Sequence, residues 1–264
     1  MDSVLDDATV SLVPAWSHTV ALAWPPSLRF FERRSDLLAQ LESQDLVSAF
    51  RWSENVIGAR LGRGEVLEVS SLGAMLITIG PDARPDKARD GLKLAIETVE
   101  PTDLRLTQAL FQFMLPVDRE YALARRQSAR QLITPLLPQA SPEDWSLLVD
   151  GRSRLSNAPF QVEFGVIDER EAPDRLSRRV GRMHAHELAP FPEDFFEDHE
   201  YPECALFFDW RWFPNRQFAP TAVDPDLFAF WDALAGESEE MCRTVQSGVG
   251  LVEESRDTDV EAER

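Results

Sequence analysis

Hydrophobic positions along this chain recur with two periods, and the changes of period predict its strands and helices. In the first hundred residues an alternating or continuous apolar pattern predicts strands at 17–24, 46–52, 55–62 and 65–80. Gly62-Arg63-Gly64 separates the last two runs and is typical of a hairpin turn. A helical period follows Pro25-Pro26, with an apolar face formed by Leu28, Phe31, Leu38 and Leu41. A second helix is predicted from Asp86 to Val99.

The second half of the chain shows a similar order of patterns. Strands are predicted at 104–115, 144–155, 159–168 and 204–213. Helix formers dominate 119–137, and Asp224-Pro225 is a typical start for the last helix. The apolar face of that last helix consists of Leu227, Phe230, Trp231, Leu234, Met241 and Val245. Both halves can therefore be written β-α-β-β-β-α, which predicts an α+β fold.

This order suggests an internal duplication, in which antiparallel sheets pack helices on one face. The two sheets could also join into one. The predicted organisation is an acidic leader at 1–15, a first half at 16–100, a second half at 101–250 and a disordered acidic tail at 251–264. The second half contains a long insertion at 169–203.

Composition narrows the classes of function. The formal net charge is 27 − 46 = −19, which repels phosphate backbones and anionic membranes. Direct nucleic-acid binding is therefore not expected, whereas a basic protein partner is compatible with this charge. Neither a signal-peptide pattern nor an apolar run long enough to cross a bilayer is present, and two cysteines make no disulfide framework. These features predict a protein of the reducing cytoplasm. Lysine occurs only at Lys87 and Lys93, and the preference for arginine, whose codons are GC-rich, indicates a bacterial source.

The insertion contains the most concentrated candidate chemistry. In an extended segment His184 and His186 point to the same side, and His199 could complete a divalent-metal site with Glu200, Glu203 or Cys204. The alternative interpretation is an acidic interaction loop that carries histidines because it is polar. We expect no cofactor under that interpretation, and a bound metal ion under the first.

Basic and aromatic residues make the same insertion a candidate protein-binding surface. Its candidate binding residues are Arg178, Arg179, Phe191, Phe195, Phe196 and Tyr201. The aromatic side chains could instead form a lid packed on the domain, because exposed phenylalanine pairs are costly. Sequence favours the lid.

Two further positions have structural and functional interpretations. Regular alternation in 204–213 places Asp209 and Arg211 on one side of a strand, where they could pair or bind a polar ligand. His18 lies in a predicted strand and is expected to be structural.

Three stretches resemble a sporadically distributed family of uncharacterised bacterial proteins of about this length. They are LRLTQALFQFMLP, CALFFDWRWF and LFAFWDALAGESEEMCRTVQSGV. The first resembles the family's central strand without its usual asparagine, and the other two resemble its closing strand and helix. The resemblance implies a duplicated α+β fold and supplies no activity or catalytic residues.

The sequence contains no GxSxG, P-loop or GxGxxG motif. We therefore expect a non-catalytic protein-binding module, such as an adaptor, inhibitor, immunity or chaperone-like protein, that uses its acidic surface and residues 170–203. One alternative is a metal-dependent hydrolase, and another is an acidic mimic of nucleic acid. A homo-oligomer is compatible with all three.

Overall fold

The computed structural model describes residues 15–80, 85–135, 138, 146–154, 156–180, 191, 195–221 and 223–251. Its strands are β1 Ser17–Ala23, β2 Ala49–Trp52, β3 Val56–Arg60, β4 Glu65–Ser70, β5 Gly73–Ile79, β6 Leu104–Pro116, β7 Leu147–Arg152, β8 Pro159–Asp168, β9 Cys204–Trp212 and β10 Arg216–Phe218. Its α-helices are α1 Leu28–Ser43, α2 Pro85–Val99, α3 Tyr121–Leu132, α4 Ala172–Val180 and α6 Ala229–Gly248. A π-helical turn, η1 Val223–Phe228, leads into α6.

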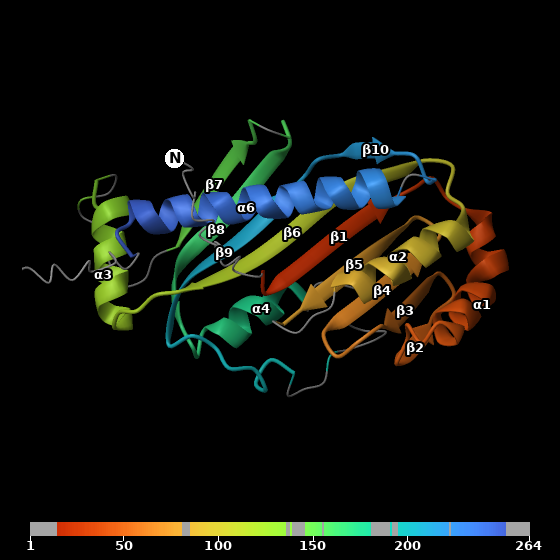
Figure 1. Ribbon diagram of the computed structural model, residues 1–264, viewed down its shortest axis with the longest axis horizontal. Helices are drawn as coiled ribbons and strands as arrows, with labels where there is room; N and C mark the ends of the chain where they lie inside the picture. Colours follow the sequence, from red (N-terminus) through yellow and green to blue (C-terminus); the bar gives the residue numbers. More distant parts are fainter. Residues whose placement is uncertain are drawn as a thin grey trace, which may run out of the picture.

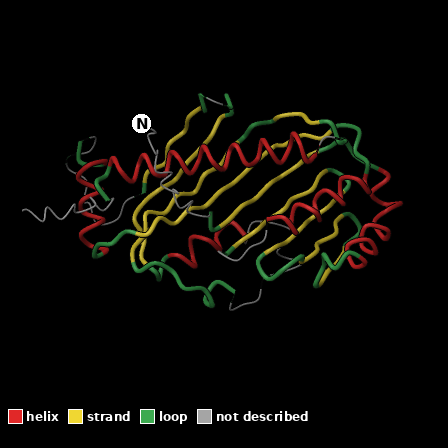
Figure 2. Tube along the Cα trace, viewed as in Figure 1, coloured by secondary structure: helices red, strands yellow, loops and turns green. Residues whose placement is uncertain are grey.

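All ten strands belong to one open antiparallel sheet, in the order β2-β3-β4-β5-β1-β6-β9-β8-β7, with β10 also paired to β6. Figure 2 shows the strands sweeping across the molecule as one continuous layer. β1 pairs with β5 on one side and with β6 on the other, so it joins the two halves of the chain. The sequence left open whether the two halves form separate sheets or one joined sheet, and the structure shows one joined sheet.

The two faces of the sheet carry different layers, because neighbouring side chains on a strand point in opposite directions. Leu76 and Phe208 belong to the main core, which is shared with α1, α2, α3 and α6. The adjacent Ile77 and Phe207 point to the other face, where α4 and the segment around Phe195 pack. We call these the helical face and the insertion face. Figure 1 shows α6 running along the helical face beside α2.

Several predicted boundaries are corrected by the structure. The run 65–80 is a hairpin, β4 and β5, and not one strand, because the chain reverses at Ser71-Leu72. The insertion contains α4, which the sequence analysis missed, and the short β10 was also missed.

The apolar face predicted for α1 is also wrong in part. Leu28 is 76% exposed and Phe31 is 39% exposed. Leu38 and Leu41 are buried as predicted, but Phe30 and Leu37 take the buried places expected for Leu28 and Phe31. Both sets fit a helical period, and packing of α1 against α2 selects the second.

The mixed α+β class is confirmed, whereas the internal duplication remains a prediction. The half before residue 101 contributes five strands and the half after it contributes five, but the second contains additional helical segments. The predicted leader and the tail beyond Leu251 lie outside the described residues.

Candidate binding site

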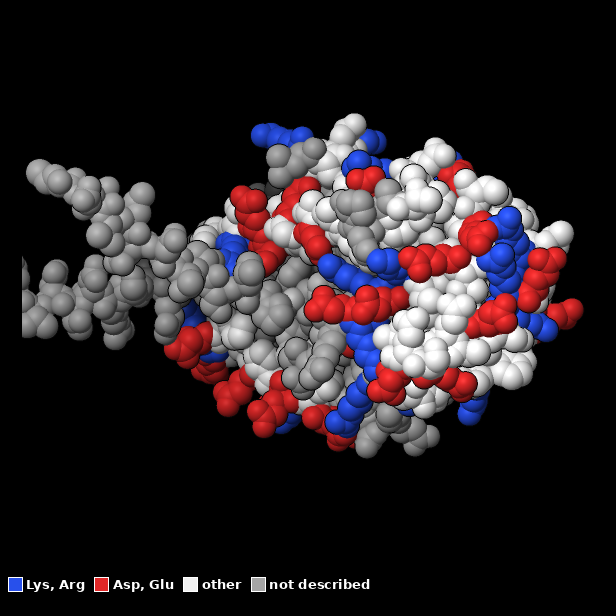
Figure 3. Space-filling view, turned by 45° about the vertical axis from the view of Figure 1, so that its right-hand side comes forward, with Lys and Arg blue, Asp and Glu red and all other residues white. Residues whose placement is uncertain are grey.

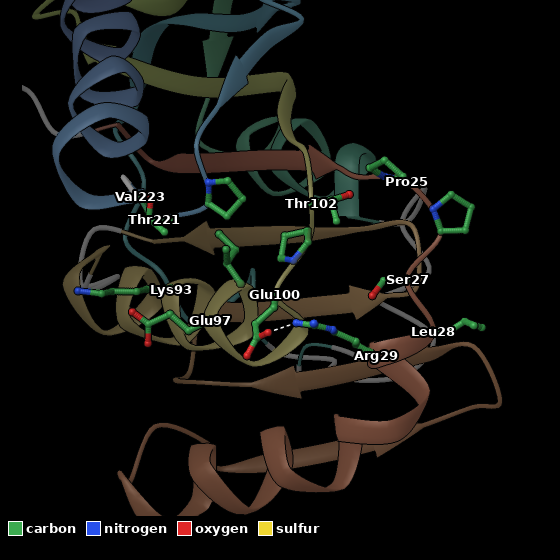
Figure 4. A pocket seen from close by; sticks show the side chains of 14 residues that line it. Pro25, Ser27, Leu28, Arg29, Lys93, Glu97, Glu100, Thr102, Thr221 and Val223 are labelled. Carbon is green, nitrogen blue, oxygen red and sulfur yellow. Dashed lines mark ion pairs between the residues drawn. The ribbon is translucent and has the colours of Figure 1, made fainter.

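A cavity of about 1040 Å³ opens where three distant segments meet at one end of the helical face. The segments are the start of α1, the last turns of α2 and the loop between β10 and η1. Four of the lining residues are prolines: Pro25, Pro26, Pro101 and Pro220. Ile96 and Val223 add buried apolar surface, and Lys93 and Glu97 add charge. Figure 4 shows these side chains around the opening.

The wall between α1 and α2 is held by an ion-pair cluster at Glu100. Arg29 and Arg33, one turn apart on α1, both pair with its carboxylate. Arg33 also donates a 3.3 Å hydrogen bond to the carbonyl of Thr98. Glu100 has φ +45°, a left-handed conformation that costs a non-glycine residue about 1–2 kcal/mol. The two arginines therefore anchor the strained residue that ends α2 and shapes the cavity.

The rim of the cavity continues into exposed apolar side chains. Leu28 lines the opening, and in Figure 4 its side chain points outward. Phe31 lies one turn further along α1, and Leu72 in the β4–β5 turn is 58% exposed. Backbone hydrogen bonds from Ser27 to Ser71 and from Trp24 to Leu72 fix this turn beside α1. We call Leu28, Phe31 and Leu72 the apolar rim.

The arrangement suits recognition of an apolar group flanked by a charge. Proline rings present rigid apolar surface, and a concave, mainly apolar lining with a few polar groups is typical of binding sites. Arg29 is already paired, whereas Glu97 is exposed at the wall. Figure 3 shows uncharged side chains gathered over the right-hand part of the molecule, with patches of both charges between them. The cavity can therefore take an apolar side chain and offer a carboxylate beside it.

The aromatic residues predicted in the insertion lie on the opposite face of the sheet. Phe191 is 6% exposed and Phe195 is 1% exposed, and both pack with Val66, Ile77 and Ile79. Phe196 and Tyr201 are half-buried beside this cluster, and the Tyr201 hydroxyl donates to the carbonyl of Phe196. The structure therefore brings these four residues together as packing for the insertion face. Their role as partner contacts remains a prediction.

The predicted metal ligands are placed only in part. His184 and His186 lie outside the described residues. His199 packs among the rings of Trp16, Phe195 and Tyr201, with centroid distances of 5.0–6.3 Å. Cys204 belongs to the core of the helical face, and burial raises the pKa of its thiol to about 11. Within the described part of the chain, no group of three His, Cys, Asp or Glu side chains is placed to hold a metal ion.

The charged residues of the insertion divide between pairing and exposure. Arg175 of α4 pairs with Glu163 of β8 at 3.1 Å, and Arg63 pairs with Asp198. Arg178 is exposed. Arg179 lies in the last turn of α4, and the placement of its side chain lies outside the description. Some of the charged side chains that were expected to contact a partner are therefore paired within the domain.

Asp209 and Arg211 share the insertion face, as the alternation predicts, and pair at 3.0 Å. Arg211 also donates to Gln161 at 3.2 Å and lies 4.0 Å from Glu163 across the strands. On the helical face, Trp210 and Trp212 are buried and donate to Cys242 and Ser238. This arrangement favours ion pairing over ligand binding for Asp209 and Arg211.

His18 occupies a packing position under α6. Its ring meets Phe111 and Trp231 edge-on, at centroid distances of 5.5 and 6.0 Å. Arg89 of α2 lies over Trp231 and pairs with Asp232. Burial, with a smaller contribution from the positive charge of Arg89 and an opposing one from Asp232, lowers the pKa of His18 to about 4.

We expect this histidine to make folding stability depend on pH. The unfolded chain binds a proton at His18 with a pKa near 6.5, whereas the folded chain does so only near 4. The contribution to stability is therefore complete above pH ~6.5 and is lost as pH falls toward 4. Comparing urea denaturation of the wild type and His18→Leu isolates the effect, since both share all other titrating groups. From pH ~7.5 to ~4.5 the wild type should lose roughly 2–3 kcal/mol more than the variant. If the free energy of unfolding fell equally with pH in the wild type and in His18→Leu, the buried placement of His18 would be contradicted.

Comparison with known proteins finds no family model and no curated sequence that matches this chain. None of the helices that the structure describes has the length and apolar character needed to cross a membrane.

The cavity is not predictable from any local pattern, because its walls come from segments around residues 25, 97 and 220. Each segment by itself has the pattern of the end of a helix or strand. Proline recurs at those ends, but it interrupts regular structure wherever it occurs and so does not indicate a cavity.

Proposed function

We propose that this chain is a protein-binding module whose main contact is the proline-lined cavity and the apolar rim. The observation that carries the proposal is the continuity between an apolar cavity and Leu28, which is 76% exposed at its edge. A small ligand inside the cavity would leave the rim in water. A protein segment can fill the cavity and cover the rim together, and contiguous exposed apolar surface is typical of interaction sites.

Charge supports a partner whose contact segment combines an apolar side chain with a basic one. The net charge of −19 attracts basic proteins over distance and raises their association rate. At the cavity, Glu97 is the exposed carboxylate that a lysine or arginine of the partner would meet. The module acts in this proposal by occupying a surface of its partner, as an adaptor, inhibitor, immunity or chaperone-like protein does.

The insertion contributes less to partner binding than the cavity does in this proposal. Because Phe191 and Phe195 are buried, their contribution is to hold the insertion against the sheet. Among the residues of 170–203 that the structure describes, exposed ones such as Arg178 are those that a partner can reach. Deleting the insertion would remove core residues, so point variants give the sharper test.

A phage-displayed random peptide library panned against the full chain provides a defined test. We expect enriched peptides to combine an aromatic or aliphatic residue with a nearby basic one. Leu28→Asp should weaken their binding by at least about tenfold, because burying a leucine contributes roughly 1.5–3 kcal/mol. Fluorescence anisotropy of labelled peptides would measure the dissociation constants.

Leu148→Asp is the matched control, since Leu148 on β7 is 58% exposed and lies away from the cavity. It should leave the affinity within about twofold. Equal loss for both variants, or no loss for Leu28→Asp, would show that the peptides bind elsewhere and would overturn the assignment of the cavity.

A further inference from the structure

A second, smaller groove runs along α3, and its lining is basic. Its volume is about 620 Å³, and its lining consists of Arg119, Leu123, Arg126, Gln127, Arg130 and Gln131. The lining contains three arginines and no carboxylate, in a chain that has 46 acidic and 27 basic residues. Such a local reversal of sign identifies the groove as a place where negative charge is stabilised.

The three guanidinium groups are available for an anionic group. Arg119 donates to the side-chain oxygen of Gln127, and the Nε of Arg126 donates to the carbonyl of Ala122 at 3.1 Å. These neutral contacts orient the groups and leave their charge uncompensated. Across the described residues, no ion pair engages Arg119, Arg126 or Arg130.

The described chain ends against this same groove. Gln127, which lines it, donates hydrogen bonds to the carbonyls of Val249 and Gly250 at 3.3 and 2.9 Å. Gly250 has φ +65°, and a Cβ there would lie 2.9 Å from the Gln127 amide nitrogen. Leu251 follows and is buried. The described part of the chain therefore ends at the lining of this groove.

The sequence beyond Leu251 is complementary in charge. Residues 252–264, VEESRDTDVEAER, contain six carboxylate side chains and two arginines. Thirteen residues can span at most about 45 Å, at roughly 3.5 Å per extended residue. The arginines from 119 to 130 cover only about 16 Å, at roughly 1.5 Å per helical residue. The segment is therefore long enough to reach all three arginines, and because it is tethered it is present at the groove at high effective concentration.

We propose that the groove along α3 binds the acidic C-terminal segment of this chain, residues 252–264. Glu253 and Glu254 are the first carboxylates after Leu251 and, in this proposal, meet the arginines nearest to Gln127. A separate acidic protein is a weaker occupant, because the net charge of −19 repels it before it arrives. Docking of the tail covers the arginines of α3 and leaves the proline-lined cavity as the accessible binding surface.

Site-directed spin labelling of the full chain tests the proposal. Cys204 and Cys242 are buried, so Val260→Cys provides a selective site for a nitroxide label. At about 20 mM salt we expect a restricted label, and at about 500 mM salt a mobile one, because screening weakens the ion pairs. Each exposed ion pair contributes a factor of up to about five to the equilibrium constant for docking of the tail. Arg126→Glu/Arg130→Glu should therefore raise the ratio of mobile to restricted label at low salt by tenfold or more, roughly.

The control is Arg34→Glu/Arg51→Glu, which makes the same change in net charge on α1 and β2, at the end of the molecule opposite α3 (Figure 1). This variant should keep the label restricted at low salt. A label that is mobile in the wild type at low salt would overturn the proposal. So would a restricted label that Arg126→Glu/Arg130→Glu leaves unchanged, because the tail would then be held elsewhere.

Discussion

Replacing Phe195 with alanine is expected to lower the free energy of unfolding by roughly 3–5 kcal/mol. The side chain is 1% exposed and packs with Val66, Ile77 and Ile79 on the insertion face. Its ring centroid also lies 4.8 Å from that of Phe191 and 5.1 Å from that of Phe196. Truncation removes the transfer free energy of the ring and leaves a cavity beneath the insertion.

Urea denaturation followed by tryptophan fluorescence would measure the change, with Phe213→Ala as the control. Phe213 is 36% exposed, so its truncation should cost less than about 1 kcal/mol. Similar small losses for both variants would mean that Phe195 does not pack on the sheet and is free to contact a partner. The experiment therefore decides between the two roles that the sequence gives to the aromatic residues of the insertion.

Replacing Gly64 with alanine is expected to cost roughly 3 kcal/mol or more, which exceeds the usual effect of a methyl group. A Cβ at this position would lie 1.9 Å from the backbone oxygen of Ile79 and 3.2 Å from the Phe195 ring. The carbonyl of Gly64 also accepts a 2.7 Å hydrogen bond from the Ile79 amide. The added carbon must therefore displace backbone that is already fixed by a hydrogen bond.

Gly236→Ala is a control that is expected to change the folding stability in the opposite direction. Gly236 lies within α6, and no heavy atom lies within 4 Å of a Cβ placed there. Alanine at a helical position is favoured over glycine by about 0.5–1 kcal/mol, so this variant should be slightly more stable than the wild type. Thermal unfolding of both variants would check the expected loss of stability for Gly64→Ala and the expected small gain for Gly236→Ala. If Gly64→Ala proved neutral, the close approach of β4 to the end of β5 would be wrong.

The turn at Gly62-Arg63-Gly64 illustrates what a local pattern can and cannot show. The glycines correctly predict a reversal between β3 and β4. Glycine at a hairpin is usually required by a positive φ, but Gly64 is not among the residues with positive φ. Here it is required by the approach of Ile79 from another strand. That reason depends on a contact far along the chain, which no local pattern contains.

Helix α1 shows a second limit. Its sequence has apolar residues all along, so Leu28 and Phe31 fit a helical stripe as well as Phe30 and Leu37 do. The rotation of the helix is decided by α2, against which the second set packs. Leu28 is consequently left exposed at the cavity rim. The residue on which the proposed function depends is thus the one that the sequence assigned to the core.

The sequence by itself determined the mixed α+β class, most of the strands and the charge that the chain presents to partners. Those properties are local or additive: alternation sets the face of each side chain, as in β8, where Val162, Phe164 and Val166 are buried. Only the tertiary structure decided that β1 and β6 join the halves into one sheet. It alone placed α4 and the segment around Phe195 on the insertion face and formed the cavity and the α3 groove. These features arise where segments distant in the sequence meet, and their contacts are set by packing across the whole molecule.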